Sequence, residues 1–382
     1  MPGIYLHIPF CRQACYYCNF HFSTSLKNKP EMVEALQTEI ALRKAFFKGT
    51  RDGESYTDII QTIYFGGGTP SLLDTKDIGV ILATLHRHFS ISDEAEITIE
   101  ANPEDITPGK LSAWKQSGIN RVSLGVQSFN DEELKWMHRS HDAQQAHHSI
   151  LEIKKAGFNN FSADLIFGIP GQTDRQWEKN IEQMLLLETP HLSCYALTVE
   201  PKTALYHFIQ KKKYLPVNEE QTARQFEILI KKLVSAGYEH YEISNFALPR
   251  FRSRHNSNYW KGVPYLGIGP SAHSFDGSRR QWNIANNMRY IQSIRQGIIP
   301  AESELLTEDM QWDEYIMTSL RTMEGCDLNY VFKKWGKAES LNLKAASNIF
   351  ISSGQMVLQN DHLILTDKGK LFADGIASAL FK

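Results

Sequence analysis

Three of the five cysteines of this chain lie close together near its start, at Cys11, Cys15 and Cys18. Four ligands would complete a tetrahedral zinc site or a closed iron–sulfur cluster, whereas three thiolates leave one metal position open to an outside ligand. An open position is one at which chemistry can take place. The spacing therefore allows two sites, a cluster with one open iron or a zinc ion for which His21 supplies the fourth ligand.

The composition sets the class of protein that must position these cysteines. The chain has 382 residues, 42% of them hydrophobic and 22% charged, which is typical of a soluble globular protein with two folded domains. A formal net charge of -2, with no long basic run, gives no electrostatic footprint for nucleic acid. No apolar run is long enough to cross a bilayer, and the start lacks a signal peptide. We therefore expect a cytoplasmic location and no transmembrane segment.

The remaining two cysteines fit this compartment. Thiols of a reducing compartment do not form a disulfide framework, which favours a metal or cluster role for the three clustered ones. Cys194 and Cys326 stand alone in apolar segments and are expected to be buried thiols.

The first half of the chain alternates between strand and helix patterns. Six β-rich runs recur, at 3–10, 58–65, 94–102, 120–129, 161–170 and 191–200. Helical patterns lie between them, at 31–47, 72–89, 108–117, 131–156 and 174–188. This alternation predicts an α/β fold of parallel βα units that close into a full or partial (β/α)6 barrel of the TIM type.

The second half is expected to finish this domain and add a smaller one. A helix over 219–236 and a Gly- and aromatic-rich stretch from 238 to 282 belong to a large domain at 1–290, whose core covers about 1–235. Beyond it, 300–382 begins with a helical pattern and ends with two short strands and a final helix. This order predicts a helical, winged-helix-like domain, for which the weak positive charge favours protein contacts over DNA binding.

Polar residues stand where the predicted strands end. The cysteines follow the first strand, Gly66–Pro70 ("GGGTP") follows the second, Glu100 ends the third and Gln127 ends the fourth, while Asp164 lies in the fifth. Because chemistry in a parallel barrel gathers at the carboxyl ends of the strands, we expect these residues at one mouth.

Their chemistry suits a ligand with an amino-acid part and a ribose. Glycines expose backbone amides and carbonyls to a ligand, Glu100 can accept hydrogen bonds from a ribose diol, and Arg139 can neutralise a carboxylate. Taken singly, "GGGTP" is also typical of a tight turn. A lone Glu or Gln is likewise typical of a buried polar group whose hydrogen bonds are satisfied within the protein. Together with the cysteines, they predict a cofactor site.

The spacing Cys11-x3-Cys15-x2-Cys18, with "GGTP" downstream, resembles the radical S-adenosylmethionine (SAM) superfamily. The resemblance implies that the three thiolates hold a [4Fe-4S] cluster whose open iron chelates the amino and carboxylate groups of SAM. It also implies that one electron from the reduced cluster cleaves SAM to methionine and a 5'-deoxyadenosyl radical.

A longer set of motifs is similar to the oxygen-independent coproporphyrinogen III dehydrogenase group over nearly the whole chain. The motifs are "YLHIPFC", "YFGGGTPSLL", "IEANPED", "RVSLGVQSF", "LKWMHRSH", "ADLIFGIPGQT" and "HNSNYW". This resemblance implies a set of SAM contacts, with Gly67 and Gly68 near the methionine amino group: Tyr5, Gly67, Gly68, Thr69, Glu100, Gln127, Arg139 and Asp164.

Phe20 departs from the dehydrogenase, which carries a cysteine two residues after the third cluster cysteine and a longer N-terminal extension. With "HNSNYW", these features resemble the heme chaperone branch of the group. That branch implies heme binding, with His255 as axial ligand and Tyr259 and Trp260 as flat surface against the porphyrin. His255 read alone is also typical of a hydrogen-bonded histidine beneath the barrel, and four other histidines compete as ligands: His7, His21, His138 and His273.

Three functions compete on these grounds. The first is a heme chaperone that hands heme to recipient proteins, with the cluster and SAM supporting transfer or the formation of a homodimer. The second is a dehydrogenase that oxidatively decarboxylates coproporphyrinogen III to protoporphyrinogen IX. The third is an RNA-modifying enzyme, which the net charge of the chain does little to support. We expect the chaperone, without dehydrogenase activity.

Overall fold

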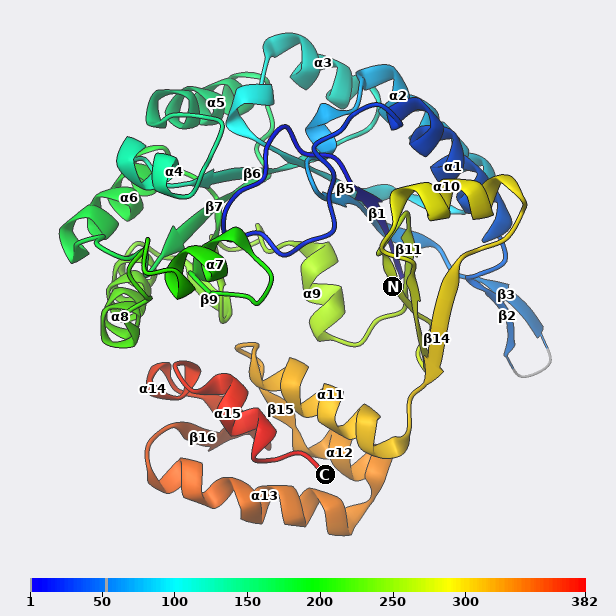
Figure 1. The fold of residues 1–382 in the computed structure, drawn as a ribbon. Coiled ribbons are helices and arrows are strands. Elements are labelled where there is room, and N and C mark those ends of the chain that lie inside the picture. The colour runs from blue at the N-terminus through cyan, green and yellow to red at the C-terminus, as the bar shows by residue number, and fades with distance from the viewer. Residues whose placement is uncertain (1, 52–53) are drawn as a thin grey trace.

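The structure is a computed structural model that describes residues 2–51 and 54–382. Its centre is a row of parallel strands that lie side by side in chain order (Figure 1). They are β1 (Gly3–Ile8), β4 (Ile60–Gly67), β5 (Ile91–Ala101), β6 (Arg121–Gln127), β7 (Phe161–Phe167) and β8 (His191–Ala196). The predicted α/β fold of parallel βα units is therefore confirmed.

Helices cover the outer face of this row of strands (Figure 1). They are α1 (Lys29–Leu42), α2 (Thr75–His88), α3 (Pro108–Gln116), α5 (Ala143–Lys155), α6 (Asp174–Leu186) and α8 (Glu219–Ser235). In α2 the buried side chains recur at helical spacing, at Ile78, Ile81, Leu82 and Leu85. Such a stripe drives a helix onto a sheet, because it removes one apolar face from water.

The sheet does not close, because further strands, most of them antiparallel to their neighbours, extend both of its ends. Beyond β8 lie β10 (Asn245–Ala247) and the edge strand β9 (Glu239–Glu242). On the other side β11 (Tyr265–Ile268) runs parallel to β1 and is followed by β12 (His273–Phe275), β13 (Arg279–Asn283) and β14 (Ala301–Leu305). Of the two predicted alternatives, the partial barrel is thus confirmed.

The single helix predicted over 131–156 is wrong. The structure has α4 (Asp131–Trp136) and α5, with a loop between them. Asp142 starts α5 with a capping box, its side chain accepting from the backbone of Gln145, and His138 has a left-handed φ of 59° that no helix continues. This loop carries Arg139, which a continuous helix would hold in a helical turn.

The C-terminal part forms its own hydrophobic cluster around Ile316, Val331 and Leu363. Its helices are α11 (Glu308–Leu320), α12 (Leu328–Trp335), α13 (Lys337–Ser352), α14 (Asp367–Lys370) and α15 (Ala373–Ser378). They surround a three-stranded antiparallel sheet of β15 (Cys326–Asp327), β17 (His362–Leu365) and β16 (Met356–Gln359). The boundary between the domains stays a prediction.

Shorter elements complete the fold. They are β2 (Lys48–Arg51), β3 (Glu54–Thr57), the 3-10 helices η1 (Pro70–Leu72) and η2 (Pro103–Asp105), α7 (Ala204–Gln210), α9 (Arg254–Trp260) and α10 (Asn287–Arg295). Cys194 and Cys326 are both buried, as predicted. Among the described residues, no helix has the length and apolar character needed to cross a bilayer.

Candidate functional site

A cavity of about 910 Å³ lies at the carboxyl ends of the parallel strands, and we call it the cysteine cavity. The three clustered cysteines line it, together with seven of the residues expected to contact SAM: Cys11, Cys15, Cys18, Gly67, Gly68, Thr69, Glu100, Gln127, Arg139 and Asp164. Tyr5 lies outside this lining, on β1, where its ring stacks on Tyr64. The expectation that strand ends would gather polar residues at one mouth agrees with this geometry.

The loop that carries the cysteines is tied to the loop between α4 and α5. Gln13 donates to the backbone oxygen of His138 at 2.7 Å, and the ring of Tyr16 stacks on that of His138 with 4.5 Å between centroids. On its other side, Arg12 forms an ion pair of 2.6 Å with the buried carboxylate of Asp105. No sequence pattern predicts these contacts of His138, because they depend on the helix break.

The glycines of "GGGTP" allow this segment to lie directly against the start of the cysteine loop. A Cβ atom on Gly68 would stand 2.6 Å from the backbone oxygen of Phe10, and one on Gly67 would stand 2.7 Å from the ring of His7. Gly67 also has a left-handed φ of 108°, which an L side chain rarely adopts. Close packing of two backbones therefore requires these glycines, whatever ligand they also face.

Two carboxyl groups with raised pKa values line the cavity. Burial raises the pKa of Glu100 to about 7, and the charge of Asp164 adds to the shift. Burial likewise raises the pKa of Asp164 to about 6. The Oδ1 atom of Asp164 is buried and has no hydrogen-bond partner among the described residues. An unsatisfied acceptor in a cavity favours a ligand that donates to it.

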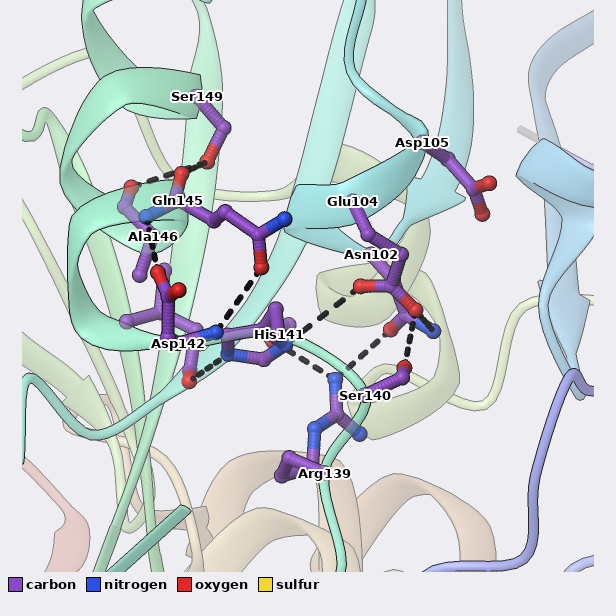
Figure 2. A network of polar contacts seen from close by, with 12 residues as sticks. Asn102, Glu104, Asp105, Arg139, Ser140, His141, Asp142, Gln145, Ala146 and Ser149 are labelled. Carbon is purple, nitrogen blue, oxygen red and sulfur yellow. Dashed lines mark hydrogen bonds and ion pairs between the residues drawn. The ribbon is translucent and has the colours of Figure 1, made fainter. Parts of the chain in front are cut away.

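Arg139 stands on the loop between α4 and α5 and lines the cavity. Figure 2 shows its guanidinium group turned toward Asn102. Its Nη2 atom donates to Oδ1 of Asn102 at 2.8 Å and to the backbone oxygen of Gly125 at 2.9 Å, while Nη1 donates to Sγ of Cys15 at 3.4 Å. Nε of Arg139 has no partner within the described part of the chain. The guanidinium group is thus fixed beside a cysteine, and its buried Nε donor meets no protein acceptor among the described residues.

Gln127 ends β6 with a left-handed φ of 67°, although it is not a glycine. It is 8% exposed and lines the cavity. A non-glycine residue held in this region of backbone space stores strain of about 1–3 kcal/mol, which the surrounding structure must offset. Such strain clusters at functional sites, and this observation is independent of the motif from which Gln127 was predicted.

The opposite wall of the cysteine cavity comes from the C-terminal part, which sequence reasoning missed entirely. Its lining residues there are Arg321, Lys370, Leu371, Phe372, Ala373, Asp374 and Gly375. Arg321 pairs with the buried Glu242 at 3.1 Å and with Asp374 at 2.9 Å. Phe20 and Phe372 are 68% and 53% exposed at the rim. No local pattern marks these residues, because they reach the site only through domain docking.

The lining fits a [4Fe-4S] cluster with SAM. Three thiols share the cavity with a carboxylate suited to a ribose, an unpartnered carboxylate oxygen and an unpartnered guanidinium nitrogen. The zinc alternative lacks its fourth ligand, because His21 lies outside the lining and its Nε2 bonds Oδ1 of Asn287 at 2.7 Å. Within residues 2–51 and 54–382, no three His, Cys, Asp or Glu side chains converge as ligands of a single ion.

A second cavity, of about 810 Å³, lies between α9 and the C-terminal helices α11 and α12, and we call it the α9 cavity. Aromatic side chains line it from both parts of the chain: Tyr259, Trp260, Tyr265, Phe275, Tyr315 and Tyr330. Cationic side chains also line it, beside three carboxylates: Arg252, Arg254, Lys261, Arg280, Lys334, Glu314, Glu324 and Asp327. Arg252 pairs with Glu324 and Arg280 with Glu314, so Arg254, Lys261 and Lys334 are the cations left to meet an anionic group on a planar ligand held by the aromatic surface.

His255, the predicted heme ligand, is only 2% exposed and lies outside the lining of both cavities. Its Nδ1 is bonded to Oγ1 of Thr62 at 2.8 Å and its Nε2 to the hydroxyl of Tyr259 at 3.0 Å. Burial, helped by the charge of Arg121, lowers the pKa of His255 to about 3 and keeps the ring neutral. In this conformation neither nitrogen is open to a metal, so ligation would require Tyr259 to move. These contacts are those of the other interpretation of His255, a histidine hydrogen-bonded within the protein beneath the barrel.

The competing histidines are placed no better for a ligand in the α9 cavity. His7 is buried, and its Nε2 bonds the backbone oxygen of His21 at 2.8 Å. His138 bonds the backbone oxygen of Ala14 through Nδ1, in the cysteine loop. His273 lies against Trp282 in a tilted arrangement, with 6.3 Å between ring centroids. None of these four histidines lines either cavity.

Comparison with known proteins places this geometry in a family. The radical SAM superfamily matches residues 5–184. The heme chaperone HemW of Bacillus subtilis is 33% identical over 99% of both chains. The chain belongs to the HemW family of the radical SAM superfamily. The HemW protein of Escherichia coli is 30% identical over 98% of this chain and 96% of its own.

Solved structures show the same fold in a relative. The coproporphyrinogen III oxidase HemN of Escherichia coli, a radical SAM enzyme, superposes with a TM-score of 0.84 over 100% of this chain and 90% of its own. Its sequence identity is 23%, so this likeness shows the fold alone. The predicted radical SAM fold of this HemW-family chain is thereby confirmed.

Proposed function

We propose that this chain is a heme chaperone that holds a [4Fe-4S] cluster on Cys11, Cys15 and Cys18 and binds SAM in the cysteine cavity. Full-length similarity to proteins named heme chaperone HemW carries the proposal. When bound, the cluster and SAM supply one-electron chemistry. The residues of the chain would hold them, with Glu100 accepting from the ribose and Nε of Arg139 available to the carboxylate of SAM.

Cluster binding is tested by anaerobic reconstitution followed by analysis of iron and labile sulfide. Wild-type protein should hold one [4Fe-4S] cluster per chain, and Cys15→Ser should lose it because a ligand is missing. Cys326→Ser is the matched control, since that cysteine is buried in the C-terminal part and should leave the cluster intact. A single zinc ion without labile sulfide in the wild type would reject the assignment.

We infer that heme binds in the α9 cavity. Tyr259 and Trp260 offer flat surface there, and Arg254 and Lys261 can pair with the propionates. The cavity volume of about 810 Å³ lies in the range common for small-molecule sites. Titration with hemin should give a stoichiometric Soret band that weakens in Trp260→Ala. The control is Phe372→Ala, on the rim of the cysteine cavity; if only that variant weakened binding, heme would lie there instead.

The dehydrogenase is the second candidate, favoured by one observation. Segment Lys370–Gly375 walls the cysteine cavity opposite the cysteines, and a radical enzyme needs an enclosed substrate. The chaperone proposal expects no conversion of coproporphyrinogen III by reconstituted protein with SAM and a reductant under anaerobic conditions. Sustained formation of protoporphyrinogen IX would overturn it. Recipient proteins, a homodimer and a cytoplasmic location belong to the same proposal.

A further inference from the structure

Glu100 meets one protein donor on each of its two carboxylate oxygens. The hydroxyl of Tyr64 donates to Oε1 at 2.9 Å, and the backbone N–H of Gly67 donates to Oε2 at 3.2 Å. Both donors belong to β4, the strand beside β5 on which Glu100 stands. Because a carboxylate oxygen accepts two hydrogen bonds, each oxygen keeps one acceptor site for a ligand. The two donors together fix the plane of the carboxylate.

Tyr64 is a buried donor that stays protonated. It is 7% exposed and lies outside the lining of the cysteine cavity. Burial, together with the charge of Glu100, raises the pKa of Tyr64 well above its ordinary value. The hydroxyl therefore keeps its proton at neutral pH and is able to donate to the Glu100 carboxylate there.

Two rings hold Tyr64 in place. Tyr5 stacks on it with 6.2 Å between ring centroids, and His255 stacks on it with 5.0 Å and an interplanar angle of 24°. His255 is itself fixed, because Thr62 and Tyr259 occupy its ring nitrogens. These contacts restrict the ring of Tyr64, whose hydroxyl donates to Glu100.

We infer that Tyr64 is a positioning residue for SAM, holding the carboxylate of Glu100 in the orientation that accepts the ribose hydroxyls. The inference rests on the proposed function, because it assumes that Glu100 contacts the ribose. Tyr64 itself does not touch the ligand, so its effect on binding passes through Glu100. His255 and Tyr5 serve the SAM site at one further remove, by holding the ring of Tyr64.

The test measures ribose recognition rather than affinity alone. The dissociation constants of SAM and of a SAM analogue without the 2'- and 3'-hydroxyls are compared in cluster-loaded wild type, Glu100→Gln and Tyr64→Phe. Wild type should prefer SAM by at least about tenfold, since a hydrogen bond to a charged group is lost with the analogue. Tyr64→Phe should reduce that preference about threefold or more. A merely structural role would weaken both ligands equally and leave the preference unchanged.

Tyr290→Phe is the matched control. Tyr290 is also a buried tyrosine that donates to a buried glutamate, Glu39, at 2.6 Å, and neither lines the cysteine cavity. Its loss should lower the melting temperature and keep the ligand preference of the wild type.

The outcomes separate the inference from the function on which it rests. A reduced preference in both Glu100→Gln and Tyr64→Phe supports the inference. A reduced preference in Glu100→Gln alone overturns it and leaves the SAM site intact. An unchanged preference in Glu100→Gln rejects the ribose contact together with the inference, and a wild type that binds no SAM rejects the proposed site itself.

Discussion

Glu100→Gln should change the stability of the SAM-free protein in opposite directions at pH 5 and pH 8. Burial raises the pKa of Glu100 from 4.5 to about 7, so the fold disfavours the charged form. Between these values the folded protein holds a proton that the unfolded chain has released. Stability from this group is therefore present at low pH and is lost as the pH rises toward 7.

The magnitude follows from the size of that shift. One pKa unit corresponds to about 1.4 kcal/mol, which gives an upper value of about 3 kcal/mol above pH 7. Glu100 also faces the solvent of the cavity, so about 2 kcal/mol is the better expectation. Glutamine removes this cost. It has only one oxygen, however, so it loses one of the two hydrogen bonds that the carboxylate accepts from Tyr64 and Gly67, which costs about 1 kcal/mol. Because pH 5 already lies above the pKa of the unfolded group, about 0.5 kcal/mol of the cost is present there. The variant should therefore be about 0.5 kcal/mol less stable at pH 5 and about 1 kcal/mol more stable at pH 8.

Urea unfolding of SAM-free protein with matched cluster content measures both values. Asp164→Asn should shift in the same direction, because burial raises the pKa of Asp164 to about 6. Glu39→Gln is the control, since Glu39 pairs with the buried Arg43 at 2.9 Å and its loss should destabilise the protein at both pH values. An equal effect of Glu100→Gln at pH 5 and pH 8 would refute the argument that the folded state disfavours this charge.

Three further predictions concern residues that line the two cavities or lie next to them. Arg321→Ala should lower the free energy of unfolding by about 2–3 kcal/mol, because it leaves the buried carboxylate of Glu242 without its cation; Arg321→Lys should restore part of it in urea titrations. Gln127→Gly should relieve backbone strain and raise the stability by about 1 kcal/mol while weakening SAM binding, measured by calorimetry. His255→Ala should leave the cluster intact. It should alter the Soret spectrum of bound heme only if His255 breaks its hydrogen bond with Tyr259 to bind the iron, and an unchanged spectrum removes His255 as the ligand.

The sequence was sufficient to predict the cavity where the argument depended on strand ends. Parallel strands end at one edge of a sheet, so Glu100, Gln127 and Asp164 had to lie near the cysteines once the βα order was assigned. Tyr5 was expected at the site from the family resemblance and not from this rule. It stands earlier on its strand, where its ring stacks on Tyr64 and lies outside the cavity lining.

Other features depend on contacts between distant segments and could not be predicted. The helix break at His138 left a continuous apolar pattern in the sequence, yet this loop holds both Arg139 and the cysteine loop. His255 was predicted as a ligand from its motif, whereas its environment is made by Thr62 and Tyr259, which occupy both ring nitrogens. A motif identifies the residue but not the hydrogen bonds that it has already formed.

The C-terminal part has a larger role than its sequence indicates, because it supplies a wall to both cavities. Phe372 and Arg321 line the cysteine cavity, while Tyr315 and Tyr330 line the α9 cavity. The contact with the barrel includes two backbone hydrogen bonds, donated by the N–H groups of Ile243 and Met323 at 3.1 Å, and the ion pair of Arg321 with Glu242. Because the same part lines both cavities, a change in how it packs on the barrel alters the two cavities together. Under the proposed function, this shared wall would couple release of heme from the α9 cavity to the ligand in the cysteine cavity.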